Sequence, residues 1–212
     1  MSTFEFLSDI YPLDETAFKR LEAYVDHLKM WQQKTNLIAP STLEEVWNRH
    51  IADSLQCLAL KPDCEHWLDL GSGGGFPGMV IAIVMADKPN SSVHLIDSNG
   101  KKTAFLRQVN RTVKARADIL TGRIEDFHHL SIEPEVVTAR ALTAMPNLLE
   151  LASPWLKNGS IGLFHKGRDF RAELEECDGL WSFDLIHHTS KISSDSVLLE
   201  VSNLKSGSEL GE

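Results

Sequence analysis

The stretch from His66 to Gly78, which reads HWLDLGSGGGFPG, limits the possible folds of this chain more than any other. A short apolar run gives way there to five glycines within eight positions. Glycine adopts positive φ and lets another molecule approach the backbone closely. Pro77 stands where a helix begins, because its missing N–H costs nothing in the first turn. The stretch therefore predicts a strand, a tight turn that cradles a ligand, and a buried helix.

Two cofactor motifs overlap in this turn. Gly73, Gly75 and Gly78 satisfy the dinucleotide pattern G-x-G-x-x-G, in which a helix N-terminus receives a pyrophosphate. Asp69 with Gly71, Gly73 and Gly75 instead forms D-x-G-x-G-x-G, which is typical of class I S-adenosylmethionine (SAM) methyltransferases. A carboxylate at the strand end suits a sulfonium and an ammonium but repels a pyrophosphate. We therefore favour SAM, with an NAD(P)-binding oxidoreductase or a nucleotide-sensing module as the alternative.

A second acidic residue supports a nucleoside cofactor. Residues 92–96 read as the next strand, and Asp97 follows directly. In nucleotide-binding folds an acid at this place, about 20 residues after the glycine turn, binds ribose hydroxyls. We expect Asp97 to bind the ribose and to cap the helix that follows.

The rest of the chain alternates between strand-like and helix-like segments after Lys61. Strands are expected at 67–70, 93–96, 118–120, 135–138 and 160–165, and helices at 78–85, 101–113 and 145–155. Such alternation predicts βαβ units and a parallel sheet. Two further strands, at 181–189 and 197–202, follow one another without a helix. We predict an α/β class I SAM-methyltransferase (Rossmann-like) fold, doubly wound and mostly parallel, with an antiparallel C-terminal strand.

The N-terminal residues predict a helical extension of this core. Asp14 is placed to cap a first helix, and Ser41 with Glu44 forms a capping box for a second. On the second helix, Asp53 stands four residues after Arg49, which predicts an ion pair within the helix. With 212 residues no second full domain fits. We divide the chain into an extension (1–60) that packs on the core, the core (61–205) and a polar tail (206–212) that we expect to be disordered.

Charge is unevenly distributed along the chain. The formal net charge of -9 argues against nucleic acid, which is bound through local positive charge. Seven basic residues nevertheless lie between positions 99 and 123, against one acid. Such a patch can bind a polyanion within an acidic protein, and a solvated helix face is the alternative. The candidate RNA-binding residues in it are Lys101, Lys102, Arg107 and Arg123.

Cysteine usage and hydropathy suggest the compartment. Cys57, Cys64 and Cys177 show no paired spacing, so we expect a reducing environment and no metal site. The first residues lack a basic segment followed by an apolar one, and no stretch reaches the length of a membrane span. We expect a soluble, cytoplasmic protein that is a monomer and has no membrane partner.

Ligands of open α/β sheets bind beyond the carboxyl ends of the strands, so the residues that follow each strand are the candidates. After the third strand, Ile124 can cover an adenine ring and Glu125 can accept its amino group. After the fourth and fifth strands come Arg140 and Lys166, each also compatible with an ordinary surface salt bridge. Arg140 stays protonated, so it can position ligands but cannot act as a base.

The residues around the fourth strand also exclude some chemistries. An Asn/Asp-Pro-Pro-aromatic turn, typical of exocyclic-amine methyltransferases, is missing. Methylation of a pyrimidine carbon needs a cysteine nucleophile, and none lies near Arg140 or Lys166 in the sequence. The acceptor is therefore expected to be nucleophilic already, as purine N7 is. No general base is then required, and catalysis depends on orientation.

Seven motifs follow one another in order along the chain: Asn36-Leu37-Ile38, Arg49-His50 with Asp53-Ser54-Leu55, the run Asp69 to Gly78, Lys101-Lys102 with Phe105-Leu106, Gly122 to Glu125, Arg140-Ala141 and Lys166-Gly167. This ordered string resembles one family, the bacterial 16S ribosomal RNA (guanine-N7) methyltransferases, also called glucose-inhibited division protein B.

The resemblance implies a SAM-dependent enzyme that methylates a guanine of small-subunit rRNA, with 16S rRNA or the small ribosomal subunit as its partner. It places cofactor contacts on Gly71, Phe76, Ile124, Glu125 and Arg140. To these the residues themselves add Gly73 and Asp97. A small-molecule SAM methyltransferase, which the acidic net charge favours, is the alternative function.

Overall fold

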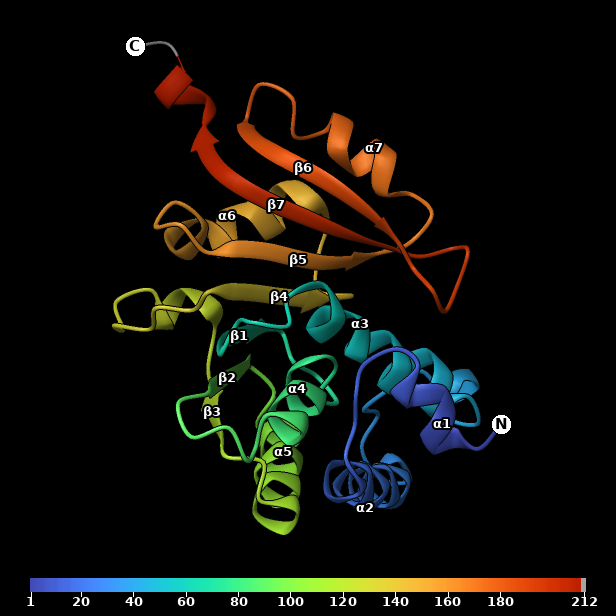
Figure 1. The fold of residues 1–212 in the computed structure, drawn as a ribbon. Coiled ribbons are helices and arrows are strands. Elements are labelled where there is room, and N and C mark those ends of the chain that lie inside the picture. Colours follow the sequence, from blue (N-terminus) through green and yellow to red (C-terminus); the bar gives the residue numbers. More distant parts are fainter. Residues whose placement is uncertain (211–212) are drawn as a thin grey trace.

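The computed structural model describes residues 1–210 and contains one seven-stranded sheet in that range. The strand order is β3-β2-β1-β4-β5-β7-β6 (Figure 1). The strands are β1 (His66–Leu70), β2 (Ser92–Asp97), β3 (Ala117–Thr121), β4 (Val136–Arg140), β5 (Ile161–Lys166), β6 (Trp181–Thr189) and β7 (Val197–Ser206).

The first five strands are parallel, and β7 joins β5 in antiparallel orientation with β6 at the edge. This confirms the predicted fold class. The strand order reverses between β1 and β4, where β1 pairs with both β2 and β4. A crevice opens at such a reversal, beyond the carboxyl ends of the strands, and it is where ligands of open α/β sheets bind.

Helices cover both faces of the sheet. Residues of α1 to α5 share one buried cluster, and α6 belongs to a second cluster on the opposite face. The α-helices are α1 (Thr3–Ser8), α2 (Glu15–Gln32), α3 (Asp53–Leu60), α4 (Gly78–Val84), α5 (Gly100–Val113), α6 (Met145–Leu156) and α7 (Phe170–Glu175). Along β1 the side chains alternate between the two clusters, since Trp67 lies in the first and Leu68 and Leu70 in the second.

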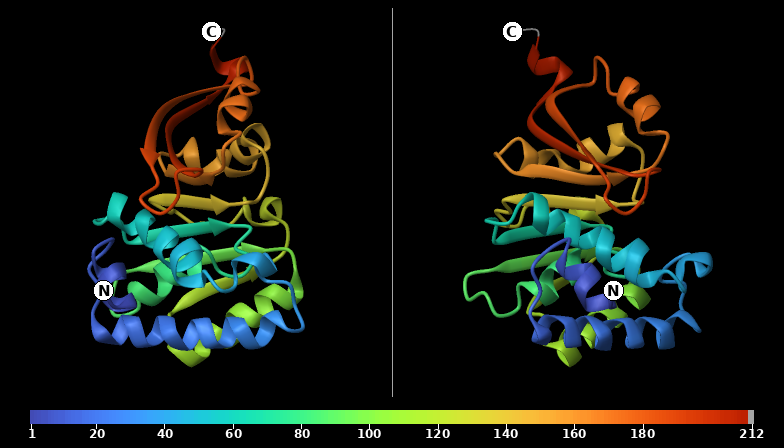
Figure 2. Two further views of the ribbon diagram at one scale, coloured as in Figure 1. Left: turned by 90° about the vertical axis from the view of Figure 1, so that its right-hand side faces the viewer. Right: turned by 45° about the vertical axis from the view of Figure 1, so that its right-hand side comes forward.

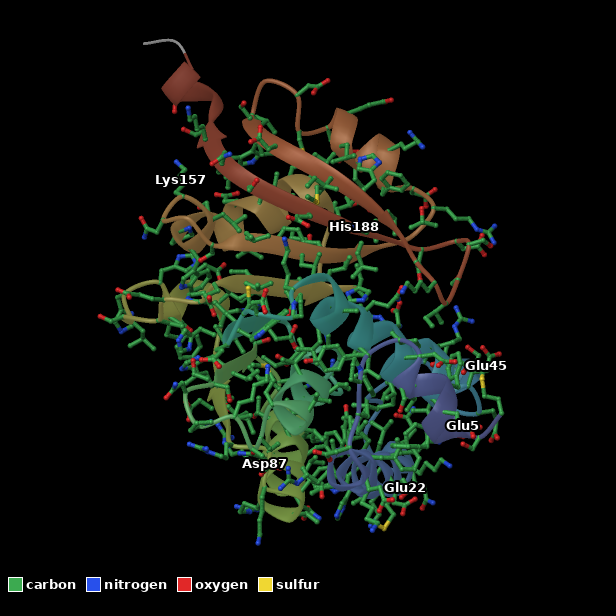
Figure 3. All side chains as sticks on the ribbon, viewed as in Figure 1. Glu5, Glu22, Glu45, Asp87, Lys157 and His188 are labelled. Atoms are coloured by element: carbon green, nitrogen blue, oxygen red, sulfur yellow. The ribbon has the colours of Figure 1, made fainter. Side chains whose placement is uncertain are left out.

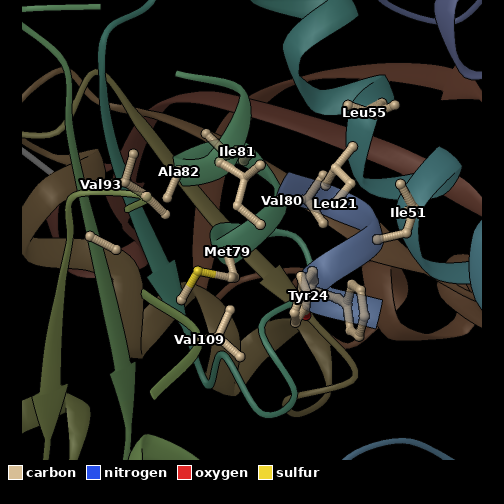
Figure 4. Packing of buried hydrophobic residues seen from close by; sticks show 14 of the residues in the cluster. Leu21, Tyr24, Ile51, Leu55, Met79, Val80, Ile81, Ala82, Val93 and Val109 are labelled. Carbon is tan, nitrogen blue, oxygen red and sulfur yellow. The ribbon is translucent and has the colours of Figure 1, made fainter. Parts of the chain in front are cut away.

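Helix α2 packs against α4 and α5 (Figures 1 and 2). Asp14 caps it as predicted, because its carboxylate accepts a hydrogen bond from the amide of Ala17 at 2.7 Å. The buried face of α2 includes Leu21 and Tyr24, which lie beside residues of α4 such as Met79 and Val80 (Figure 4). Exposed carboxylates such as Glu22 project from the opposite side of α2 (Figure 3).

The capping box predicted at Ser41 is wrong. Pro40–Thr42 forms a short 3-10 helix whose N-cap is Ala39, so Ser41 lies inside this turn and does not precede a helix that it could cap. The backbone then forms a π-helix, Trp47–Ala52, which runs directly into α3. Short π segments often occur at functional sites. Here the segment brings Arg49 and Asp53 to the carboxyl end of β4.

The C-terminal end is more regular than expected. Strand β7 continues to Ser206, and Gly207–Leu210 forms a 3-10 helix, so the expected disorder is wrong for residues 206–210. Residues 211 and 212 lie outside the described range. The division at positions 60 and 205 stays a prediction. In the part of the chain that the structure describes, no helix is both long and apolar enough to cross a membrane.

Candidate active site

The glycine turn between β1 and α4 needs glycine for two physical reasons. Gly71, Gly73 and Gly75 have φ of +67°, +56° and +101°, which side chains rarely adopt. A Cβ on Gly71 would lie 2.5 Å from Leu142, and one on Gly75 would lie 2.7 Å from the hydroxyl of Tyr24. A Cβ on Gly73 would have no protein atom within 3.4 Å. The turn is therefore packed against protein at Gly75 and has open space at Gly73. Gly73 does not line the pocket described below, so its contact with a cofactor stays a prediction.

The carboxylate of Asp97 orders this turn. One oxygen accepts a hydrogen bond from the amide of Gly73 and the other from the amide of Asn99, both at 2.8 Å. The prediction that Asp97 caps helix α5 is wrong, because the N-cap residue is Asn99, whose side chain accepts from the amides of Lys101 and Lys102. Each carboxylate oxygen keeps a further lone pair, so Asp97 can still accept hydrogen bonds from ribose hydroxyls.

A pocket of about 420 Å³ lies beside Asp97 and has the chemistry of a nucleoside site. Gly71, Asp97, Ile124 and Glu125 line it, as predicted for cofactor-binding residues. Ile124 is buried while Glu125 is exposed, so the pocket offers an apolar wall with an acid at its edge. We name it the cofactor pocket; its lining residues are Gly71, Ile96, Asp97, Ser98, Asn99, Lys102, Gly122, Arg123, Ile124, Glu125, Ala141, Leu142 and Leu151.

Phe76 does not line the cofactor pocket. Its ring is buried and contacts the rings of Tyr24 and His50, with centroids 5.4 and 4.7 Å apart. The structure thus places this predicted cofactor residue behind the glycine turn, where it joins the turn to the N-terminal helices.

Asp69 is also hidden from the pocket, although its charge was the basis for preferring SAM to NAD. Its carboxylate accepts hydrogen bonds from the hydroxyl of Thr138 at 2.8 Å and from the amide of Gly78 at 3.2 Å. Asp69 is only 1% exposed, and this burial raises the pKa of its carboxyl group to about 6. Asp69 therefore fixes the start of α4 rather than contacting a ligand.

A second pocket of about 650 Å³ lies beyond the ends of β4 and β5. Arg140 and Lys166 line it, as predicted for residues that position the acceptor. We name it the acceptor pocket; its lining residues are Glu45, Asn48, Arg49, Asp53, Ala139, Arg140, Ala141, Leu142, Thr143, Leu148, His165, Lys166, Gly167, Glu173, Ile192, Ser193, Asp195 and Ser196. Ala141 and Leu142 line both pockets, so the two sites meet at the loop that follows β4.

Arg140 is held by the N-terminal segment. Its Nη2 donates to the carbonyl of Arg49 at 2.7 Å, and its Nη1 lies 3.4 Å from a carboxylate oxygen of Asp53. The predicted ion pair of Arg49 with Asp53 is wrong, because Arg49 lies near Glu45 instead, at 3.8 Å. Arg140 lines the acceptor pocket and not the cofactor pocket, so a contact with the cofactor stays a prediction.

The amine of Lys166 supports the loop between β4 and α6. It donates to the carbonyl of Thr143 at 2.8 Å and lies 2.5 Å from the carboxylate of Glu173. The same oxygen of Glu173 accepts from the amide of Met145. Lys166 therefore shapes the wall of the acceptor pocket through the loop it holds.

The candidate RNA-binding residues differ in availability. Lys101 and Arg123 are exposed, and Lys102 lies half-buried at the edge of the cofactor pocket. Arg107 instead donates to the carbonyl of Ile119 and to the hydroxyl of Thr121, which ties α5 to β3. Its guanidinium is already used within the fold.

Residues at the acceptor pocket were largely missed from the sequence, among them Asn48, His165 and the β6–β7 loop. Of these, His165 stands directly opposite Arg140 in the β4–β5 pairing. The sequence does carry a signal for this pocket, because Arg49 and Asp53 share one helix face. That spacing by itself, however, predicts an ion pair within the helix. Among the described residues no group of His, Cys, Asp and Glu could hold a metal ion.

The sheet order, the glycine turn and the carboxylate at the end of β2 define a class I SAM-dependent methyltransferase. An O-methyltransferase from Bacillus cereus was solved with S-adenosylhomocysteine (SAH), the demethylated product of SAM. It shares this fold with a TM-score of 0.57 and 13% identity over 94% of this chain and 96% of that one. At this identity the likeness concerns the fold alone.

The sequence comparisons identify the family. The family model of rRNA small subunit methyltransferase G matches residues 17–197. A ribosomal RNA small subunit methyltransferase G of Chelativorans sp. is 46% identical over 92% of both chains. One of Brucella anthropi is 47% identical over 95% of both. The chain belongs to the rRNA small subunit methyltransferase G family, and it is a SAM-dependent enzyme that methylates ribosomal RNA.

Proposed function

We propose that this enzyme transfers the methyl group of SAM to N7 of a guanine in 16S rRNA, as a monomer in the cytoplasm. Family membership supports the rRNA substrate, and the acceptor pocket supports the choice of nitrogen. Net charge favours the alternative of a small acceptor, which the experiment below includes.

The observation that carries the proposal is the pairing of every acid at the acceptor pocket. Within residues 1–210, four carboxylates line it, and each lies beside a cation. The pairs are Glu45 with Arg49, Asp53 with Arg140, Glu173 with Lys166, and Asp195 with Arg168. Each of these carboxylates is therefore engaged with a cation and is not left free to take a proton from the acceptor.

The one imidazole that lines the described part of this pocket belongs to His165. Its Nε2 lies 3.1 Å from the carbonyl of Asp53, which can only accept, so this nitrogen carries a proton. Burial lowers the pKa of His165, which makes it a weaker base, and its other ring nitrogen, Nδ1, is buried where an acceptor cannot reach it. The described lining of the pocket therefore offers no accessible free base, as expected for an acceptor such as N7 that has no proton to lose.

The charges that line the pocket also suit the reaction. Methylation of N7 moves positive charge from the sulfonium to the purine. With Arg168, which pairs with Asp195, four cations balance the four carboxylates of the described lining. The pocket therefore adds no net positive charge that would oppose the cationic product. SAM supplies the methyl group, and the protein holds N7 in line with it.

We assign the phosphate contacts to Lys101, Lys102 and Arg123. Lys102 and Arg123 line the cofactor pocket, and Lys101 lies exposed beside them at the start of α5. A strand of RNA whose guanine occupies the acceptor pocket could reach these cations along the same edge of the sheet.

The function is tested with labelled SAM and small ribosomal subunits that lack N7-methylguanine. We expect one modified guanine in 16S rRNA, located by cleavage at N7-methylguanine. Parallel reactions with naked 16S rRNA and with assembly intermediates identify the substrate form. Label at another base atom, or in a pool of small metabolites alone, would contradict the proposal. Sedimentation of the purified enzyme tests the monomer.

A further inference from the structure

The buried residues next to Arg140 form a connected network. Asp53 is 6% exposed and Gln56 4%. The Nε2 of Gln56 donates to one carboxylate oxygen of Asp53 at 2.8 Å, and the other oxygen faces Nη1 of Arg140. His165 donates to the backbone carbonyl of the same Asp53. We call Asp53, Gln56, Arg140 and His165 the Asp53 network.

The network reaches the other side of the acceptor pocket through Gln56. Its Oε1 accepts from the amide of Lys191 at 2.7 Å, and its Nε2 also lies 3.2 Å from the hydroxyl of Ser190. These two residues begin the β6–β7 loop, whose later residues Ile192, Ser193, Asp195 and Ser196 line the pocket. Gln56 thus joins the β6–β7 loop to Asp53, the partner of Arg140.

Arg140 would be poorly fixed without this network. Arginine has several rotatable bonds, and holding it costs side-chain entropy. The backbone carbonyl of Arg49 holds only Nη2. In the described chain Nη1 has no hydrogen-bond partner, and the charge of Asp53 is the feature that keeps it in place.

We propose that Asp53 and Gln56 are positioning residues that fix the guanidinium of Arg140 in the acceptor pocket and link it to the β6–β7 loop. The proposal rests on the proposed function, in which Arg140 orients the acceptor guanine. Asp53 and Gln56 act through Arg140 and need no contact with the substrate.

A double-mutant cycle tests the proposal. Asp53→Asn keeps the shape of the side chain and removes its charge, and it should lower kcat by about 10-fold or more in the presence of Arg140. In the Arg140→Ala background the same change should lower kcat by less than about twofold, because residues that act through one another are not additive. The affinity for SAH should stay within about twofold in both backgrounds, since neither Asp53 nor Gln56 lines the cofactor pocket.

Glu200 provides a matched control. It is a buried acid with one lysine and one histidine partner, Lys61 at 2.6 Å and His188 at 2.7 Å, but it lines neither pocket. Glu200→Gln should lower the melting temperature and leave kcat unchanged. Gln56→Met gives the same cycle if Asp53→Asn does not fold.

Equal losses of kcat from Asp53→Asn with and without Arg140, or a loss of kcat in Glu200→Gln, would overturn the positioning role. Failure of the wild-type enzyme to modify guanine N7 would instead overturn the proposed function, so the two failures are distinguishable.

Discussion

The hydroxyl of Tyr24 donates a hydrogen bond of 2.5 Å to the carbonyl oxygen of Gly74. The tyrosine belongs to α2 and is completely buried, while the glycine lies in the turn that shapes the cofactor pocket. Helix α2 is therefore a structural part of the cofactor site, although none of its residues lines the pocket.

Tyr24→Phe should weaken cofactor binding. The substitution leaves the buried carbonyl of Gly74 without its donor, which costs about 1–3 kcal/mol. Without this hydrogen bond the glycine turn is also held less firmly in the geometry that shapes the cofactor pocket. We expect a lower melting temperature and an SAH affinity reduced several-fold, measured by calorimetry. Tyr11→Phe, at a half-buried position outside both pockets, is the control, and equal behaviour of the two variants would contradict the prediction.

Arg140→Ala should reduce methyl transfer by about 10-fold to 100-fold, or roughly 1.4 to 2.8 kcal/mol, while the protein stays folded. Arg140→Lys should recover little, because an ammonium cannot reach both the carbonyl of Arg49 and the carboxylate of Asp53 as a planar guanidinium does. Single-turnover rates with small subunits measure the effect. Near-normal rates in a folded Arg140→Ala protein would reduce Arg140 to an ordinary ion pair.

The basic residues of α5 should separate into two groups. Replacing both Lys101 and Lys102 with Ala should weaken RNA binding and lower the slope of log affinity against log salt by about 0.9 per lost contact on a duplex. Arg107→Ala should leave this slope unchanged and reduce thermal stability, since it removes hydrogen bonds to Ile119 and Thr121. Binding titrations at several salt concentrations test this division into two groups, and a flatter slope for Arg107→Ala would contradict it.

Two buried groups should make stability depend on pH in opposite directions. Burial, with the charges of Arg140 and Arg49, lowers the pKa of His50 from 6.5 to about 3. The unfolded chain then binds this proton more tightly, so stability is full above pH 6.5 and is lost as the pH falls toward 3. Burial raises the pKa of Asp69 from 3.8 to about 6, so its contribution rises as the pH falls through that range.

Between pH 6 and 4 the two contributions should largely cancel, because the unfolded chain binds the His50 proton more tightly and the folded chain binds the Asp69 proton more tightly. His50→Gln should therefore make the protein gain stability as the pH falls through this range, and Asp69→Asn should make it lose stability. Melting temperatures measured across this range test both, with His129→Gln at an exposed position as the control. Parallel curves for all three variants would refute the assignment.

The sheet and the cofactor pocket were predictable because their signals are local. Short apolar runs mark the strands, glycines mark the turn, and Asp97 follows its strand directly. The role of Asp69 was not predictable in the same way, because its carboxylate points to the α4 side of β1 and is covered by Gly78. A position directly after a strand therefore does not show whether the side chain at that position contacts the ligand.

The acceptor pocket was less predictable because its contacts join distant parts of the chain. The bond from His165 to Asp53 spans 112 positions, and that from Arg140 to Arg49 spans 91. The periodicity of the sequence carries no information about partners that lie so far apart along the chain. Likewise, the basic pattern around α5 cannot tell a free Lys101 from an Arg107 whose guanidinium is bonded to β3.

The order of synthesis gives the packing of α2 a further consequence. The bond between Tyr24 and Gly74 spans 50 positions, and Phe105, which also contacts the Tyr24 ring, emerges later still. Most of the stability of a helix in a protein comes from the packing of its apolar face. While the ribosome makes this protein, the N-terminal segment therefore has to wait for the cofactor turn and α5 before it can dock, and until then its apolar face is open to chaperones.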